Sequence, residues 1–177
     1  PLRAARTRAT RPRQQTVQRY LGQESWQFVL EHLESWPRAT AREVAHYQRT
    51  KFLISFLYLT GLRRSEVAQA STADLVQRRG QWWLHVSSKG HTGLPVPVAQ
   101  DALQALQTYR ISLGRSPWPN PHQSEPLLMD LYGKGRQLTS KAVHQIVTAL
   151  FDSAAKACPD PEQARLLQSA TTHWLRH

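Results

Sequence analysis

Apolar side chains recur every three to four positions over much of the chain, the spacing of one face of an α-helix. The second helical stretch is nearly apolar toward its end, KFLISFLYLT, so we expect that helix to be largely buried. Thr40 and Glu43 have the spacing of a capping box at the start of this helix, and Gly61 is typical of the left-handed residue that ends a helix. The pattern predicts helices over residues 24–35, 40–60, 64–69, 101–113, 139–157 and 162–169.

The period changes to two near residue 82, where two β-rich runs, 82–86 and 94–98, flank a polar turn with glycine. These runs predict an antiparallel hairpin, and the run 127–129 predicts a short third strand. A last helix is expected to begin at Thr171 or Thr172. Strands and helices do not alternate, so a doubly wound sheet is excluded. The predicted class is α+β and mainly α, a helical domain with one small antiparallel sheet.

The charge balance indicates which class of partner the chain binds. The chain has 23 Lys and Arg against 12 Asp and Glu, a net charge of +11. A domain this basic is expected to bind a polyanion such as DNA. Residues 1–19 are rich in arginine, lack acids and hold few apolar side chains, which indicates a linker or a basic arm that follows DNA.

Other features exclude several classes. No apolar run reaches the length of a membrane span, so we expect no membrane partner. Cys158 is the one cysteine and has no partner for an internal disulfide, which favours a reducing compartment. The chain begins at Pro1, so we expect it to be a fragment of a longer protein.

The segment TGLRRSE, residues 60–66, is the first candidate for chemistry. A buried helix ends at Gly61 and Arg63 follows at once, which holds a guanidinium on the rigid core, ready to bind an anion. Glu66 lies three residues on, where it is able to orient Arg63. The alternative is an ordinary surface ion pair after a helix cap.

A second candidate is Lys89, in the turn SSKGHTG. A mobile lysine there is able to reach a phosphate or to donate a proton to a leaving oxygen. The alternative is an ordinary solvated lysine.

The last five residues, HWLRH, form the third candidate. In a helix, His173, Arg176 and His177 lie on or near one face. Histidines at i and i+4 are able to bind zinc, but no carboxylate or thiolate completes a shell and Arg176 repels a cation. An anion site fits better, with Arg176 on phosphate oxygens and a histidine exchanging protons.

The three boxes in this order resemble the catalytic domain of the tyrosine recombinase, or phage integrase, family. The resemblance covers residues 21–177 and makes residues 1–20 resemble the linker or arm from an N-terminal core-binding domain. It implies cleavage of one DNA strand by a tyrosine through a 3′-phosphotyrosyl intermediate, without metal or cofactor. Arg63 and Arg176 would bind the scissile phosphate, Lys89 would protonate the 5′-oxygen, and His173 would assist proton transfer. Glu66 and His177 would support the site.

Two departures from the family pattern stand out. The family has a basic residue before its VP dipeptide, where this chain reads Gly93-Leu94-Pro95-Val96-Pro97. The family also places its nucleophilic tyrosine after the arginine of the third box, and no tyrosine of this chain follows Arg176. We therefore assign none of the five tyrosines as nucleophile, and we expect this stretch of catalytic domain to be incomplete and inactive by itself.

Two other hypotheses stay open. One is a DNA-binding or regulatory truncation of such a recombinase without catalysis. The other is a metal-dependent phosphodiesterase that uses His173 and His177. The resemblance further implies a tetramer on DNA for the full-length protein, in a bacterial cytoplasm at the nucleoid. The sequence leaves open the DNA target, and whether the system is a mobile genetic element, such as a phage or a transposon, or a chromosomal one.

Overall fold

The computed structural model describes residues 20–88, 91–120, 124–131 and 135–176, and these confirm the predicted class. Residues 1–19, where the basic arm is expected, lie outside the described residues. The helices are α1 (Gln23–Glu34), α2 (Ala41–Thr60), α3 (Arg64–Gln69), α4 (Gln100–Ser112), α5 (Ser140–Ala157) and α6 (Pro161–Ser169). The described strands are β1 (Leu75–Arg78), β2 (Gln81–Leu84), β3 (Ser87–Ser88), β4 (His91–Thr92) and β5 (Val96–Val98). Two 3-10 turns are also described, η1 (Thr72–Asp74) before β1 and η2 (Thr172–Leu175) after α6.

Both predicted ends of α2 are confirmed. The Thr40 Oγ1 accepts the Glu43 N–H at 3.2 Å, and the Thr40 N–H donates to the Glu43 carboxylate at 2.9 Å. At the other end Gly61 has φ of +63° and its N–H donates to the Leu57 carbonyl at 3.0 Å. A residue with a Cβ is strained in this conformation, so glycine suits the position. The chain therefore leaves α2 at a defined residue in a defined direction.

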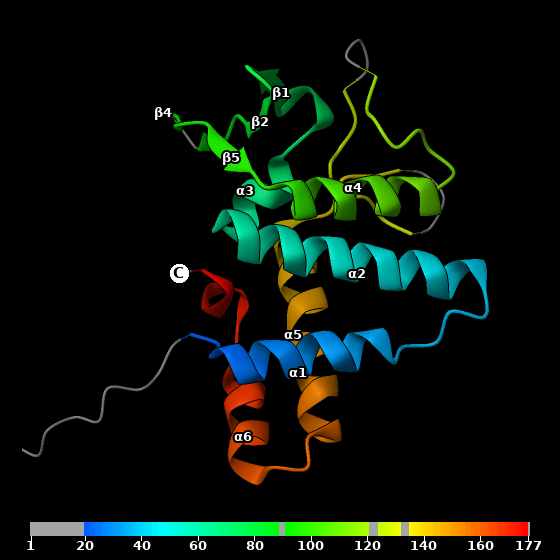
Figure 1. The fold of residues 1–177 in the computed structure, drawn as a ribbon, viewed down its shortest axis with the longest axis vertical. Coiled ribbons are helices and arrows are strands. Elements are labelled where there is room, and N and C mark those ends of the chain that lie inside the picture. The colour runs from blue at the N-terminus through cyan, green and yellow to red at the C-terminus, as the bar shows by residue number, and fades with distance from the viewer. Residues whose placement is uncertain (1–19, 89–90, 121–123, 132–134, 177) are drawn as a thin grey trace, which may run out of the picture.

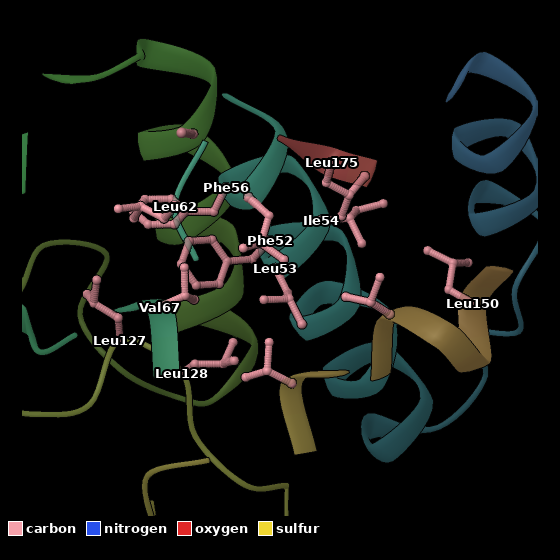
Figure 2. Packing of buried hydrophobic residues seen from close by; sticks show 14 of the residues in the cluster. Phe52, Leu53, Ile54, Phe56, Leu62, Val67, Leu127, Leu128, Leu150 and Leu175 are labelled. Carbon is pink, nitrogen blue, oxygen red and sulfur yellow. The ribbon is translucent and has the colours of Figure 1, made fainter. Parts of the chain in front are cut away.

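α2 lies at the centre of the fold, packed against α4 and crossed by α5 (Figure 1). Phe52, Leu53 and Ile54 are consecutive and all fully buried, so this helix is covered on more than one side, as predicted. The Phe52 ring stacks on Tyr109 of α4 with centroids 5.3 Å apart. Figure 2 shows Phe52, Leu53 and Ile54 within the core. Each fully buried large apolar side chain contributes about 1.5–3 kcal/mol, so α2 is a rigid base for the segments at its ends.

The sheet is only partly as predicted. β2 pairs with β5, as the predicted hairpin requires, but β3 and β4 form a second small hairpin between them. β1 was missed, because its run LVQR shows little alternation of apolar and polar residues. A tight turn, with positive φ at both Arg79 and Gly80, pairs β1 with β2. The order of the larger sheet is β1-β2-β5.

The strand predicted over residues 127–129 is wrong. Leu127 donates its N–H to the Ala70 carbonyl at 2.9 Å, and Met129 forms only an isolated bridge with Gln137. The Tyr109 hydroxyl accepts the Met129 N–H at 3.1 Å. The run is apolar because it enters the core, and its backbone groups bond to separate partners instead of one strand.

The last element also differs from the prediction. η2 is a 3-10 turn, and the Thr171 hydroxyl at its start accepts the His173 N–H at 3.4 Å. Arg176 has extended backbone angles, φ −104° and ψ 129°. The helical face proposed for His173 and Arg176 therefore does not form, because helical geometry ends at Leu175. His177, the third residue of that proposed face, lies outside the described residues.

Candidate active site

Arg63 lies at the surface, two residues after the turn that ends α2. After the turn at Gly61, Leu62 enters the core at 4% exposure, and Val67 of α3 is fully buried. Arg63 stands between these two anchors as the residue that precedes α3, and its side chain is 61% exposed. The backbone at Arg63 is thus fixed by the core while its guanidinium faces solvent.

Glu66 makes the contact with Arg63 that the sequence predicted, in a different geometry. One carboxylate oxygen accepts the Arg63 backbone N–H at 2.6 Å, and the other accepts its Nη1–H at 2.9 Å. Glu66 holds both because Arg63 lies at the start of α3 and not on the helix face. An exposed ion pair adds only about 0–1 kcal/mol of stability, so its main effect is on the direction of the guanidinium.

Arg176 is held by the same turn. Its Nε–H donates to the Gly61 carbonyl at 2.7 Å. The preceding Leu175 is fully buried and lies near Ile54 of α2 (Figure 2). Guanidinium has five N–H donors, and this bond uses one of them. The tertiary contact, and not a helical face, therefore sets the position of Arg176.

Arg63, His173 and Arg176 line one hollow of about 630 Å³. Among the described residues that line it there is no carboxylate, so cationic groups dominate the space. Guanidinium groups that converge in this way favour a phosphate or another oxyanion. The remaining lining residues are Arg64, Ser65, His144, Thr171 and Thr172.

Two of the predicted site residues, Lys89 and His177, lie outside the described residues. β3, which ends one residue before Lys89, contacts α3. The N–H of Gly93 donates to the Val86 carbonyl at 3.0 Å, and a Cβ on this glycine would lie 2.9 Å from that oxygen. A side chain at this position would push the two backbone segments apart. Glycine therefore keeps the base of the β3–β4 hairpin closed, and the hairpin lies beside α3, the helix that Arg63 precedes.

None of the described tyrosines lines the hollow. Tyr47 donates to the Glu34 carboxylate at 2.6 Å and Tyr58 stacks on Trp26 with centroids 4.2 Å apart. Within the described ranges, no three His, Cys, Asp or Glu side chains gather as metal ligands. No described helix combines the length and the hydropathy that crossing a membrane requires.

His144 is a lining residue from a helix in which the sequence predicted no site residue. It lies in α5, next to the fully buried Val143, and α5 contacts both α3 and η2. In the sequence it reads as a residue beside the apolar stripe of an amphipathic helix. No local signal identified it, because its place at the hollow depends on how α5 docks.

Several known proteins are similar to this chain in sequence. The sequence profile of the phage integrase family matches residues 33–177. A tyrosine recombinase of Synechococcus elongatus is 32% identical over 106 residues, which are 60% of this chain and 32% of that protein. Tyrosine recombinase XerC of Mycobacterium tuberculosis is 32% identical over 131 residues, 72% of this chain and 41% of that protein. This chain thus matches only about a third to two fifths of the length of these relatives.

A solved structure shares the fold. The XerH site-specific recombinase, bound to its difH substrate before cleavage, superposes with a TM-score of 0.62 at 20% identity. The match covers 90% of this chain and 41% of that one.

Proposed function

This chain belongs to the phage integrase family, and we propose that it provides the phosphate-binding part of the active site of a tyrosine-type site-specific DNA recombinase. One observation carries the proposal: the Gly61 carbonyl fixes Arg176 beside the turn that presents Arg63, and both arginines line one hollow. Two preorganised guanidiniums are suited to a phosphate whose charge grows during the reaction.

The proposed reaction is a phosphoryl transfer. A tyrosine oxygen attacks the scissile phosphorus, the bond from phosphorus to the 5′-oxygen breaks, and a 3′-phosphotyrosyl link forms. Arg63 and Arg176 bind the non-bridging oxygens, and Lys89 donates a proton to the leaving 5′-oxygen. His173 hydrogen-bonds the phosphate and assists proton transfer at the nucleophile. A 5′-hydroxyl of a second DNA then attacks the link and restores a phosphodiester, so no cofactor is consumed.

Glu66 and His177 have supporting roles in this proposal. Glu66 directs the Arg63 guanidinium through the carboxylate contact described above. His177 follows Arg176 directly, and we assign it a packing or orienting role. We assign none of the five tyrosines of this chain as the nucleophile.

The partner in this proposal is double-stranded DNA. The net charge of +11 supports it, since most affinity for DNA comes from the phosphate backbone. The XerH site-specific recombinase, whose fold this chain shares, is known in complex with its difH substrate. We extend the proposal to a tetramer on paired DNA sites, at the nucleoid in a bacterial cytoplasm.

The test is formation of a covalent adduct. The complete gene product that contains this chain is first used to select duplexes from a random pool. Selected duplexes are then labelled and nicked close to the cleavage position, so that the released short strand is lost. We expect a labelled adduct that survives denaturation and that is cut to a phosphotyrosine peptide by protease.

Variants sharpen this test. Arg176→Lys keeps the charge but lacks the planar fork, so we expect about a hundredfold slower adduct formation at similar duplex affinity. Arg38→Lys is the matched control, because Arg38 lies in the loop before α2 and pairs with Glu34, the last residue of α1. A gene product that binds duplexes tightly yet forms no adduct with any of them overturns the enzymatic proposal. That result favours a DNA-binding or regulatory protein without catalysis.

A further inference from the structure

His144 has a feature that the proposed chemistry does not use. His144 lines the hollow with Arg63 and Arg176, yet its Nδ1 is buried and has no hydrogen-bond partner among the described residues. A buried polar atom without a hydrogen-bond partner destabilises the folded state. Such an atom calls for an explanation, and a position beside a cationic hollow offers one.

The two ring nitrogens of His144 are not equivalent. A neutral imidazole has one N–H donor and one bare nitrogen that accepts. An unpaired buried N–H is rarer than an under-satisfied acceptor, so the bare nitrogen belongs at the buried Nδ1. The proton then lies on Nε2, the nitrogen that is not enclosed. The hollow is also lined by Arg63, Arg64 and Arg176, so an N–H donor at this place adds to a site for an oxyanion.

The backbone of His144 is firmly placed, so the ring has a fixed origin. Its carbonyl accepts the Thr148 hydroxyl at 3.0 Å within α5, and the neighbouring Val143 and Val147 are fully buried. α5 packs on α3, which Arg63 directly precedes, and on η2, which Arg176 directly follows. Side chains in a helix lean toward its N-terminus, and His144 lies in the second turn of α5. Its ring therefore faces the end of the helix that meets the hollow.

We infer that His144 contacts the substrate, with its Nε2–H donating to a phosphate oxygen of the DNA strand bound in the hollow. The inference rests on the proposed function and adds a fourth donor group, from a third element, to Arg63, His173 and Arg176. The acceptor is a non-bridging oxygen of the scissile phosphate or of its neighbour on the same strand.

Orthovanadate is the first probe, because it mimics a phosphoryl group in transfer. Ring nitrogen signals of the histidines are followed by NMR as vanadate is added to the 177-residue chain. We expect the Nε2 signals of His144 and His173 to shift and those of His32, bonded to Ser153 away from the hollow, to stay. The shifts are lost in Arg176→Ala. A His144 signal unmoved by vanadate, while His173 shifts, means contact with the neighbouring phosphate or no contact.

Variants decide between these outcomes. Gln places an amide N–H near Nε2, whereas Phe fills the space without a donor. We expect His144→Phe to slow adduct formation by the complete gene product about tenfold, as for loss of a hydrogen bond to a charged group. His144→Gln should recover most of that rate. Gln145→Ala, an exposed change on the same turn, is the control and should leave the rate unchanged.

Substitution of single phosphates then locates the acceptor. Methylphosphonate at the scissile or the neighbouring position removes the charge there. The position where His144→Phe causes no further loss is the one that His144 contacts.

Stability separates a substrate contact from a structural role. Phe removes the unpaired nitrogen, so we expect His144→Phe to raise the Tm by about 2–4 °C while it slows the reaction. A lower Tm together with equal losses for Phe and Gln overturns the inference and makes His144 a packing residue. If the unchanged gene product forms no adduct, the proposed function is overturned. The inference about His144 is then tested by the vanadate shift alone: a shift of its Nε2 signal supports an oxyanion contact, and no shift overturns it.

Discussion

Arg176 donates its Nε–H to the Gly61 carbonyl at 2.7 Å, although the two residues are 115 positions apart. The bond joins the end of η2 to the turn after α2, two residues before Arg63. One backbone oxygen therefore ties together the two segments that present the arginines. A change at this turn should affect both arginines at once.

Gly61→Ala tests this relationship. The glycine has φ of +63° and a Cβ would meet nothing within 4 Å, so the cost is backbone strain of about 1 kcal/mol. Relief of that strain moves the carbonyl that holds Arg176. We expect a small loss of stability in urea unfolding together with a large loss of adduct formation.

Gly114→Ala is the matched control, because Gly114 has φ of +69° and equally open space at its Cβ. It ends α4, away from the hollow. Equal losses of activity for the two variants at equal stability would contradict a special role for the Gly61 turn.

Substitutions at Glu66 separate capping from orientation. Gln keeps an oxygen for the Arg63 backbone N–H but not the charge that attracts its guanidinium. We expect Glu66→Gln to keep the free energy of unfolding within about 0.5 kcal/mol and to slow adduct formation. Glu66→Ala should lower both, by about 1 kcal/mol in stability through the lost cap. A Gln variant with full activity would mean that the ion pair is an ordinary surface contact.

Lys89 is predicted to be a general acid, which a change of leaving group can test. Lys89→Ala should form the adduct on normal DNA about a hundredfold or more slowly, because the 5′-alkoxide leaves poorly without a proton. A 5′-bridging sulfur leaves as a thiolate and needs no proton. The same variant should therefore be near full rate on the sulfur substrate. Failure on both substrates would indicate that Lys89 binds DNA instead.

Leu94 occupies the stretch where the family pattern has a basic residue, and its side chain is 88% exposed. Leu94→Arg should add one phosphate contact. We expect tighter duplex binding at low salt and a dependence of log K on log salt that is steeper by about 0.9. The control is Leu59→Arg, which changes an exposed apolar residue of α2. An unchanged salt slope would place Leu94 away from the DNA.

His46 is expected to contribute to the pH dependence of the free energy of unfolding. Burial and the nearby Arg49 and Arg42 lower the pKa of His46 below its ordinary 6.5. The unfolded chain therefore binds the proton first as the pH falls, so stability is present above pH 6.5 and is lost below it. Urea unfolding at pH 7.5 and 5.5 should show a smaller loss for His46→Gln than for the unchanged chain. An equal loss in both would assign the effect to other groups, such as His32, whose pKa burial also lowers.

The sequence by itself determined the parts that depend on local physics. The capping box at Thr40 and the left-handed Gly61 follow from side chains a few positions apart, and both bounds of α2 are as predicted. The contact of Glu66 with Arg63 is local too, and three residues suffice to specify it. The order of the three boxes was enough to indicate the family, because their spacing is a property of the chain alone.

Tertiary structure decided what depends on distant partners. Arg176 was expected on a helical face with His173, but η2 ends earlier and a carbonyl from the other half of the chain holds the guanidinium. His144 reaches the hollow only because α5 docks on α3 and η2. Strand β1 and the buried run 127–129 likewise take their form from neighbours that local pattern does not encode. A periodicity reports which side of an element is buried, whereas the partner that buries it is chosen by packing of the whole core.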